Sequence, residues 1–313
     1  MSDNNASWER EVVTQLAESS LREQRRARRW GIFFKALTFA YIGGILFMFG
    51  DASLTKVNIS EKHTALIELN GVIADNELAS ADNIVTALRD AFDNENSAGV
   101  ILRINSPGGS PVQSGYIYDE ILRLRENNPD TPLYAVVTDI CASGGYYIAS
   151  AADKIYADKA SIVGSIGVRM DNFGFVDAID KLGIERRTLT AGDNKALLDP
   201  FLPENEKAKS HMQTMLTEIH QQFIDAVKQG RGDRLDSSVE GVFSGLIWTG
   251  EAAVNIGLVD ELASSSHVAR EVIGEETIVD YTLKEDILER FAERLGSTVA
   301  QVISTQLFPS TPR

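Results

Sequence analysis

The segment GVILRINSPGGSP, residues 99–111, runs from a buried strand through two glycines into the start of a helix. Residues 99–105 form a mostly apolar run of strand length. Ser110 and Pro111 then suit the N-cap and the first helical position. Free N–H groups in the glycine turn can hold an oxyanion or a phosphate. No Gly-Lys-Ser/Thr sequence follows, so the segment is not a Walker loop.

Strands and helices alternate on both sides of this segment. Apolar runs rich in strand formers are predicted as strands at 64–73, 99–105, 133–137 and 154–158. A long amphipathic helix is predicted at 203–230, and a second helical stretch at 283–307, near the carboxyl end of the chain. This order favours right-handed βαβ units and therefore an α/β fold with a mostly parallel sheet.

A second strand-to-helix junction, ICASGGYYIASAAD, covers residues 140–153. A serine at this junction, Ser143, lies beside a helix amino terminus, where free N–H groups and the helix dipole favour an anion. An acyl-transfer enzyme needs that arrangement next to its nucleophile. The alternative is a serine that only caps the helix, with Gly144 and Gly145 serving close packing. Cys141 replaces the first glycine of a G-x-S-x-G elbow.

A serine nucleophile requires a base, and histidine is the usual one. None of the four histidines lies in a glycine-rich or strand-end segment. His211 and His220 stand among polar residues of the predicted helix, and we expect them at the surface. Lysine is the other option, provided that it is desolvated enough to lose its proton. Lys195, in TAGDNKALLDPF (residues 190–201), is a candidate because apolar residues follow it.

Composition excludes several functional classes. The formal net charge of −15 argues against a general nucleic-acid binder. The histidines form no HExxH motif, and no Cys/His cluster has metal-ligand spacing, so we expect no metal and no other cofactor. One cysteine among 313 residues rules out an internal disulfide bond.

Residues 30–50 read WGIFFKALTFAYIGGILFMFG and predict a membrane anchor. About 21 residues at roughly 1.5 Å each span a bilayer core. Five arginines lie directly before this stretch: Arg22, Arg25, Arg26, Arg28 and Arg29. By the positive-inside rule they stay cytoplasmic, and the rest of the chain crosses the membrane. A buried core helix and a cleaved signal peptide are the alternatives.

Five motifs, taken together and in order, make the chain resemble the signal peptide peptidase A family, the S49 Ser–Lys peptidases, in its short single-domain form. They are NSPGGS (105–110), ASGGYYIA (142–149), GSIGV (164–168), GDNKALLDPF (192–201) and TGEAAVNIGLVDEL (249–262). The resemblance implies a ClpP/crotonase-like stack of ββα units behind an N-terminal transmembrane helix. It covers the chain from about Thr64 to Leu262.

The resemblance also implies the roles of the site residues. Ser143 would be the nucleophile and Lys195 the general base. Ser165 would hydrogen-bond the lysine ammonium and orient it. The backbone N–H groups of Gly109 and Gly144 would form the oxyanion hole.

The expected organisation follows from the anchor and the resemblance. Residues 1–29 form a cytoplasmic segment, 30–50 the signal anchor, 51–274 an extracytoplasmic peptidase domain and 275–313 a helical extension. We expect a single-pass protein of the cytoplasmic membrane with its catalytic domain in the periplasm or otherwise outside the cytoplasm. The implied substrates are signal peptides and other membrane or envelope peptides. The implied partners are membrane lipid and further copies of the chain in a ring.

Two other functions stay open at this point. A crotonase-type acyl-CoA enzyme uses the same stacked units and backbone oxyanion holes, but it needs no serine nucleophile and no anchor. A catalytically silent scaffold could instead organise other membrane proteases. A serine-directed label on Ser143 separates both from a protease.

Overall fold

The computed structural model of the protein describes residues 22–44 and 61–284. The chain divides into two units, Met1–Asn58 and Ile59–Arg313. In the first, residues 22–44 form one continuous helix. Within the described ranges, no helix combines the length and the apolar character needed to cross a bilayer. The span predicted over 30–50 continues past residue 44, so its last part lies outside the described residues, as does nearly all of the helix predicted over 283–307.

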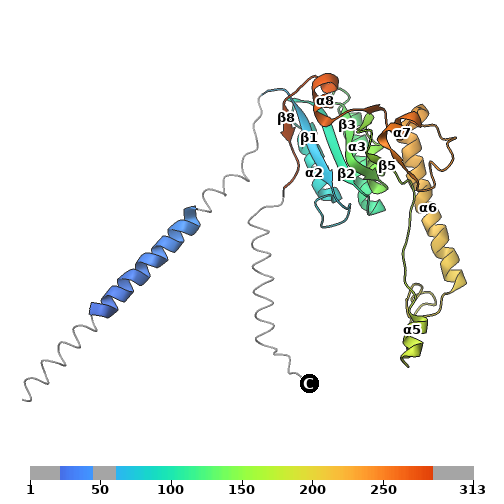
Figure 1. The fold of residues 1–313 in the computed structure, drawn as a ribbon, viewed down its shortest axis with the longest axis horizontal. Helices are drawn as coiled ribbons and strands as arrows, with labels where there is room; N and C mark the ends of the chain where they lie inside the picture. The colour runs from blue at the N-terminus through green and yellow to red at the C-terminus, as the bar shows by residue number, and fades with distance from the viewer. Residues whose placement is uncertain (1–21, 45–60, 285–313) are drawn as a thin grey trace, which may run out of the picture. The chain divides into compact units, whose positions relative to one another are not determined.

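The described part of the second unit is built around one mixed sheet of eight strands (Figure 1). The strands are β1 (His63–Asn70), β2 (Ser97–Ser106), β3 (Leu133–Ala142), β4 (Lys154–Ala157), β5 (Ile162–Gly164), β6 (Ile247–Thr249), β7 (Glu261–Leu262) and β8 (Ile278–Asp280). The helices are α2 (Ala81–Phe92), α3 (Pro111–Asn127), α4 (Gly144–Ala149), α5 (Val176–Lys181), α6 (Glu206–Arg231), α7 (Gly250–Asn255) and α8 (Ser265–His267). Two short turns complete the list, the 3₁₀ turn η1 (Gly232–Arg234) and the π-helical turn η2 (Val268–Ile273).

The sheet is parallel except at one edge, which confirms the predicted α/β architecture. Its strand order is β6-β5-β3-β2-β1-β8, and among the described strands only the pairing of β5 with β6 is antiparallel. Strand β3 changes partner along its length. Its first half pairs with β4 over Tyr134–Val137, and its second half pairs with β5 from Ile140 onward. The carboxyl ends of β2, β3 and β5 therefore meet at one edge of the sheet.

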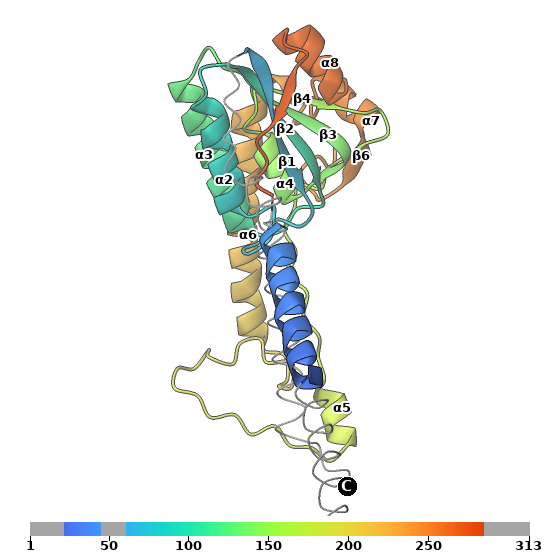
Figure 2. The same cartoon turned by 90° about the vertical axis from the view of Figure 1, so that its left-hand side faces the viewer.

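Alternation along the central strands builds a core on each face of the sheet. Ala65, Ile67 and Leu69 of β1 point into the larger core, which is shared with α2, α3, α4 and α6. Leu66 points to the opposite face, where it packs with residues of η2 such as Val268. Figure 2 shows helices on one side of the sheet and α8 at its upper edge. Burying one such Leu or Ile side chain contributes about 1.5–3 kcal/mol.

A buried ion-pair network fixes the carboxyl end of α6 to the sheet. Arg231 is fully buried, donates from Nε to the Gly257 carbonyl at 2.9 Å and pairs with Asp260 at 2.7 Å. The Asp260 carboxylate also accepts the Ile155 N–H of β4 at 2.7 Å. Burial raises the pKa of Asp260, but the hydrogen bond and charge of Arg231, the Ile155 N–H and the charge of Arg234 together hold that pKa below its usual value. The network sets the position of α6, the helix that reaches the candidate site.

Between β5 and α6, residues 170–205 form a long excursion that we call the arm. It carries α5 and lies at the amino-terminal end of α6, away from the sheet (Figure 1). Two side-chain contacts hold the segments of the arm together. Phe175 stacks on Phe201 with ring centroids 5.5 Å apart, and Arg186 pairs with Asp199 at 2.8 Å.

Candidate active site

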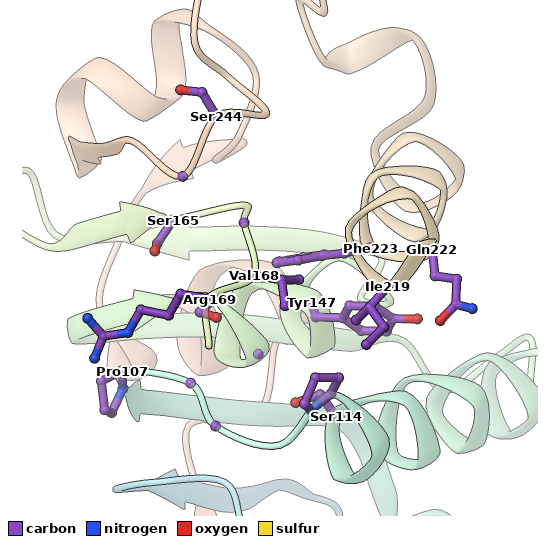
Figure 3. A pocket seen from close by; sticks show the side chains of 17 residues that line it. Pro107, Ser114, Tyr147, Ser165, Val168, Arg169, Ile219, Gln222, Phe223 and Ser244 are labelled. Carbon is purple, nitrogen blue, oxygen red and sulfur yellow. The ribbon is translucent and has the colours of Figure 1, made fainter. Parts of the chain in front are cut away.

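Three loops that leave adjacent parallel strands form one cleft. The turn after β2, the junction after β3 and the turn after β5 lie side by side, because the order of these strands is β5-β3-β2. Clefts outside the carboxyl ends of parallel strands are the usual binding sites of α/β sheets. This cleft has a volume of about 770 Å³, within the range of small-ligand sites (Figure 3). Its lining residues are Pro107, Gly108, Gly109, Pro111, Ser114, Ser143, Gly144, Tyr147, Ser165, Gly167, Val168, Arg169, Ile219, Gln222, Phe223, Ser244 and Gly245.

Ser143 has a backbone conformation that L-residues rarely adopt. Its φ is 52° and its ψ is −124°. Among the described non-glycine residues, only Asn76, Ser143 and Ser165 have positive φ values. Such a conformation costs on the order of 1–3 kcal/mol and is concentrated at functional sites. Two of the three strained residues of the described chain therefore line the same cleft.

The hydroxyl of Ser143 is not used as a helix cap. Ser143 occupies the N-cap position of α4, but its side chain makes no capping hydrogen bond. Ser110, at the start of α3, shows the contrasting case, because its Oγ accepts the Gln113 N–H at 3.4 Å. The backbone N–H of Ser143 donates to the Gly164 carbonyl of β5 at 2.9 Å. The backbone is thus held by the neighbouring strand, and Ser143 lines the cleft with a hydroxyl that caps no helix.

The N–H groups of Gly109 and Gly144 lie beside each other at the cleft. A Cβ placed on Gly144 would be 3.3 Å from the Gly109 nitrogen. Gly144 is the first residue of α4, where an N–H group has no partner inside the helix. In the described part of the chain, neither N–H donates a hydrogen bond. Two free donors next to the Ser143 hydroxyl match what an oxyanion hole requires.

Glycine is required at this point by close backbone approach. Gly108 has a φ of 100°, and a Cβ there would come within 2.7 Å of both the Gly144 nitrogen and the Ser143 Cβ. A Cβ on Gly144 would collide with the Ser114 hydroxyl, which donates to the Ser110 carbonyl at 2.9 Å. The glycine turn after β2 therefore packs directly against the Ser143 junction.

Ser165 lines the cleft from the third loop. Its φ is 55°, and its N–H donates to the Leu246 carbonyl at 2.7 Å. His220 of α6 hydrogen-bonds the next carbonyl, that of Ile166, through Nε2 at 3.1 Å. His220 is half-buried, so the prediction that it lies at the surface is wrong, whereas His211 is exposed as predicted. The polar sequence neighbours of His220 face solvent, while its imidazole turns toward the loop that carries Ser165.

One end of the cleft is apolar, and the sequence analysis assigned none of the residues at this end to the site. We call Tyr147, Ile219 and Phe223 the apolar end. The rings of Tyr147 and Phe223 lie 5.0 Å apart, and burial raises the pKa of Tyr147. Phe223 and Ile219 belong to the apolar stripe of α6, which by itself indicates only a core-facing surface.

Cys141 is separated from the cleft although it lies two residues before Ser143. Its side chain is fully buried in the larger core. Burial raises the pKa of its thiol, so the group stays uncharged and unreactive. The change of direction at Ser143 leaves Cys141 on the core side of β3.

The described chain does not bring Lys195 to Ser143. Lys195 lies in the arm, is exposed, and donates its N–H to the Gly192 carbonyl at 3.1 Å. It is not one of the residues that line the cleft, which contains no lysine, histidine or carboxylate among the described residues. Of the predicted site residues, Ser143, Ser165, Gly109 and Gly144 therefore share one cleft, and Lys195 stands apart.

Comparison with known proteins bears on the family of the chain. The model of peptidase family S49 matches residues 125–277. A putative signal peptide peptidase SppA of Enterococcus faecium is 29% identical over 269 residues, which are 81% of this chain and 77% of that protein. A putative protease of Methanocaldococcus jannaschii is 30% identical over 244 residues, which are 76% of this chain and 77% of that protein.

A third similarity covers much less of the relative. The Na⁺/H⁺ antiporter NhaA of Brucella abortus is 44% identical over 189 residues, which are 60% of this chain. The chain spans only 25% of that antiporter's length, so nothing about transport carries over to this chain. The matches to the Enterococcus faecium and Methanocaldococcus jannaschii proteins, by contrast, extend over most of both chains. The chain belongs to peptidase family S49, the family of signal peptide peptidase A.

Proposed function

We propose that the protein is a serine endopeptidase with a Ser–Lys dyad, in which Ser143 is the nucleophile and Lys195 the general base. In the first step, the neutral Lys195 amine takes the hydroxyl proton while Ser143 Oγ attacks the peptide carbonyl carbon. The N–H groups of Gly109 and Gly144 hold the resulting oxyanion. Ser165 accepts a hydrogen bond from the lysine ammonium and orients it.

The reaction then runs through an acyl-enzyme. The Lys195 ammonium returns its proton to the leaving amine, the C–N bond breaks, and the Ser143 ester remains. Lys195 next takes a proton from water, whose oxygen attacks the ester carbonyl. The second tetrahedral intermediate collapses with loss of Ser143 Oγ, which takes the proton back from Lys195, and the carboxylic acid product leaves and releases its remaining proton to solvent.

One observation carries the proposal. Ser143 has a strained backbone and a hydroxyl free of capping, and it lies beside two unpaired N–H groups in one cleft. A helix cap alone needs neither the strain nor the unpaired donors. A crotonase-type enzyme shares the stacked units and the backbone donors but makes no use of the serine hydroxyl.

Serine-directed labelling tests the proposal. We expect a fluorophosphonate probe to modify the oligomeric protein at one residue, Ser143, because only an activated serine displaces the fluoride. The Ser143→Ala variant should take up no label, and Ser150→Ala, which changes a buried serine seven residues later at the C-cap of α4, should label like the wild type if it folds. A folded wild-type oligomer that neither labels nor cleaves peptides would favour the silent scaffold.

The proposal includes a membrane anchor formed by residues 30–50. Its support is the apolar surface of helix 22–44, where Phe33, Phe39 and Tyr41 are more than half exposed, and the arginines that precede it. In this proposal the amino terminus is cytoplasmic and the peptidase domain faces the periplasm or cell exterior. Signal peptides and other membrane peptides would then reach the cleft from the bilayer in which they are left.

The topology can be tested with protease added to spheroplasts. We expect the fragment after residue 51 to be digested and an epitope before Trp30 to survive until the membrane is permeabilised. Moving the arginine charge to the other flank is the matched control, because it should invert the result. Protection of the peptidase domain in intact spheroplasts would contradict the proposed orientation.

The proposal also includes a ring of several copies. Its support is the exposed apolar surface of the arm, where the large side chains with more than a third of their surface exposed are Met170, Phe173, Phe175, Leu182, Ile184, Leu189, Leu198 and Phe201. Exposed apolar patches on this scale are typical of interaction surfaces. A head-to-tail contact through the arm would close a ring and carry Lys195 to another copy's Ser143.

A further inference from the structure

The candidate cleft contains one charged side chain. Of all its lining residues within the described chain, only Arg169 carries a charge. It lies on the loop after β5, four residues beyond Ser165. The surrounding protein has a formal net charge of −15, so a cation at this point stands out from the overall field. The mechanism proposed above makes no use of it.

The guanidinium of Arg169 is available to a ligand. Its recorded partner is the carboxylate of Asp171 at 3.5 Å, and the two side chains are 88% and 68% exposed. A pair this long and this exposed is weak, because water screens it and both side chains keep their freedom. Arginine has five N–H donors in a planar fork that matches the two oxygens of a carboxylate. Most of those donors are free for a substrate.

The charge and the apolar end lie on opposite sides of the cleft. In Figure 3 the Arg169 side chain extends toward Pro107, while the rings and chains of the apolar end gather at the far side. A bound peptide that crosses the cleft would place an apolar side chain at one end and meet the guanidinium at the other. The cleft therefore distinguishes the two ends of its ligand.

We propose that Arg169 is a specificity-determining residue that binds a substrate carboxylate at the end of the cleft opposite the apolar end. This inference rests on the proposed peptidase function and names the peptides that the cleft prefers. The carboxylate has two possible sources, an acidic side chain or the C-terminus of the peptide. A C-terminal carboxylate close to the cut arises when another endopeptidase has already released the fragment, so a prior endoproteolytic step would supply this substrate.

The test uses quenched fluorescent peptides that differ in one carboxylate. One pair has the same sequence and ends in a free acid or an amide. A second set carries Glu or Gln at each position on either side of the cut. In one of the two sets, we expect the wild type to cleave the peptide with the extra carboxylate about ten- to a hundred-fold faster in kcat/KM than its neutral counterpart. One charge-assisted contact allows a preference of this size. The preference should shrink as salt is raised.

Variants assign the preference to the residue. In Arg169→Gln the ratio of rates within the preferred pair should fall to near one, and Arg169→Lys should keep part of it, because a lysine retains the charge without the fork. Arg169→Glu should invert the choice in favour of a Lys-containing peptide. Arg270→Gln is the matched control, since Arg270 is an exposed arginine paired with Glu271 away from the cleft, and its ratio should equal the wild-type ratio.

The outcomes separate this inference from the function on which it rests. If Ser143 is labelled and neutral peptides are cleaved, but no pair shows a preference, the role of Arg169 is refuted and the peptidase stands. An Arg169→Gln variant that slows all peptides equally would also refute it, because that residue would then act in folding or assembly. If nothing is labelled and nothing is cleaved, the proposed function fails and the inference fails with it. Preference for the acid over the amide identifies the C-terminus, and preference for Glu over Gln identifies a side chain.

Discussion

Lys195→Arg is expected to lose peptidase activity as completely as Lys195→Ala, by about a thousand-fold or more in kcat. The general base must accept a proton, and an arginine side chain effectively never loses its own. Retaining the positive charge therefore does not retain the function. The measurement is kcat on a fluorescent peptide together with fluorophosphonate uptake, which reports acylation of Ser143 directly.

Two comparisons show whether the loss belongs to the base. Lys181→Arg changes an exposed lysine of α5 in the same arm and should leave the rate unchanged. Ser165→Ala removes only the orienting hydrogen bond, so the rate should fall about ten- to a hundred-fold, less than for the base itself. Substantial turnover by Lys195→Arg would remove Lys195 from this role.

The sequence predicts the part of the site that depends on local signals. The strand, glycine and helix pattern around Gly109 and around Ser143 places both at strand ends, and a parallel sheet brings such ends to one edge. In the structure, both line one cleft. Ser165 differs, because no local pattern indicated it and only the family resemblance did. The strand that precedes it, β5, has three residues, which are too few for an alternating pattern to indicate a strand.

The parts of the site that come from distant segments were not predictable from the sequence. Phe223 lines the cleft from α6, and His220 of the same helix hydrogen-bonds the Ile166 carbonyl next to Ser165, although both lie more than fifty residues beyond Ser165 in the chain. Their helix reads as an amphipathic surface helix whichever partner covers its apolar stripe. Strands β6 and β8 pair with neighbours far away in sequence and are three residues long. Such contacts depend on tertiary packing, which composition and spacing do not encode.

The position of Lys195 leads to the second prediction, that the dyad forms between two copies of the chain. Within the described chain, Lys195 is exposed in the arm and does not line the Ser143 cleft. The arm also exposes large apolar side chains, with Phe173 and Leu182 each 73% exposed. If a neighbouring copy covers this surface, the contact would desolvate the lysine and favour the neutral amine that a base requires. It would also leave a free monomer inactive.

Mixing two inactive variants tests this arrangement. Ser143→Ala protomers and Lys195→Ala protomers each lack one half of the dyad, so each oligomer alone should be inactive. After subunit exchange, some interfaces join an intact Ser143 of one copy to an intact Lys195 of the next, and a ring of random composition should recover about a quarter of the wild-type sites. Protomers that carry both substitutions are the matched control, because mixing them with either single variant creates no complete dyad.

The presence or absence of restored activity, whatever its amount, distinguishes a shared dyad from a dyad within one chain. A dyad within one chain cannot be restored by any mixture, because every chain lacks one member whatever its neighbours contribute. Subunit exchange must be shown separately, by energy transfer between differently labelled protomers, so that a negative result is informative. Confirmed exchange without recovered activity would refute the sharing of the dyad between copies. It would not refute the proposed roles of Ser143 and Lys195. Recovered activity would explain why the cleft of the described chain contains Ser143, Gly109 and Gly144 but no lysine.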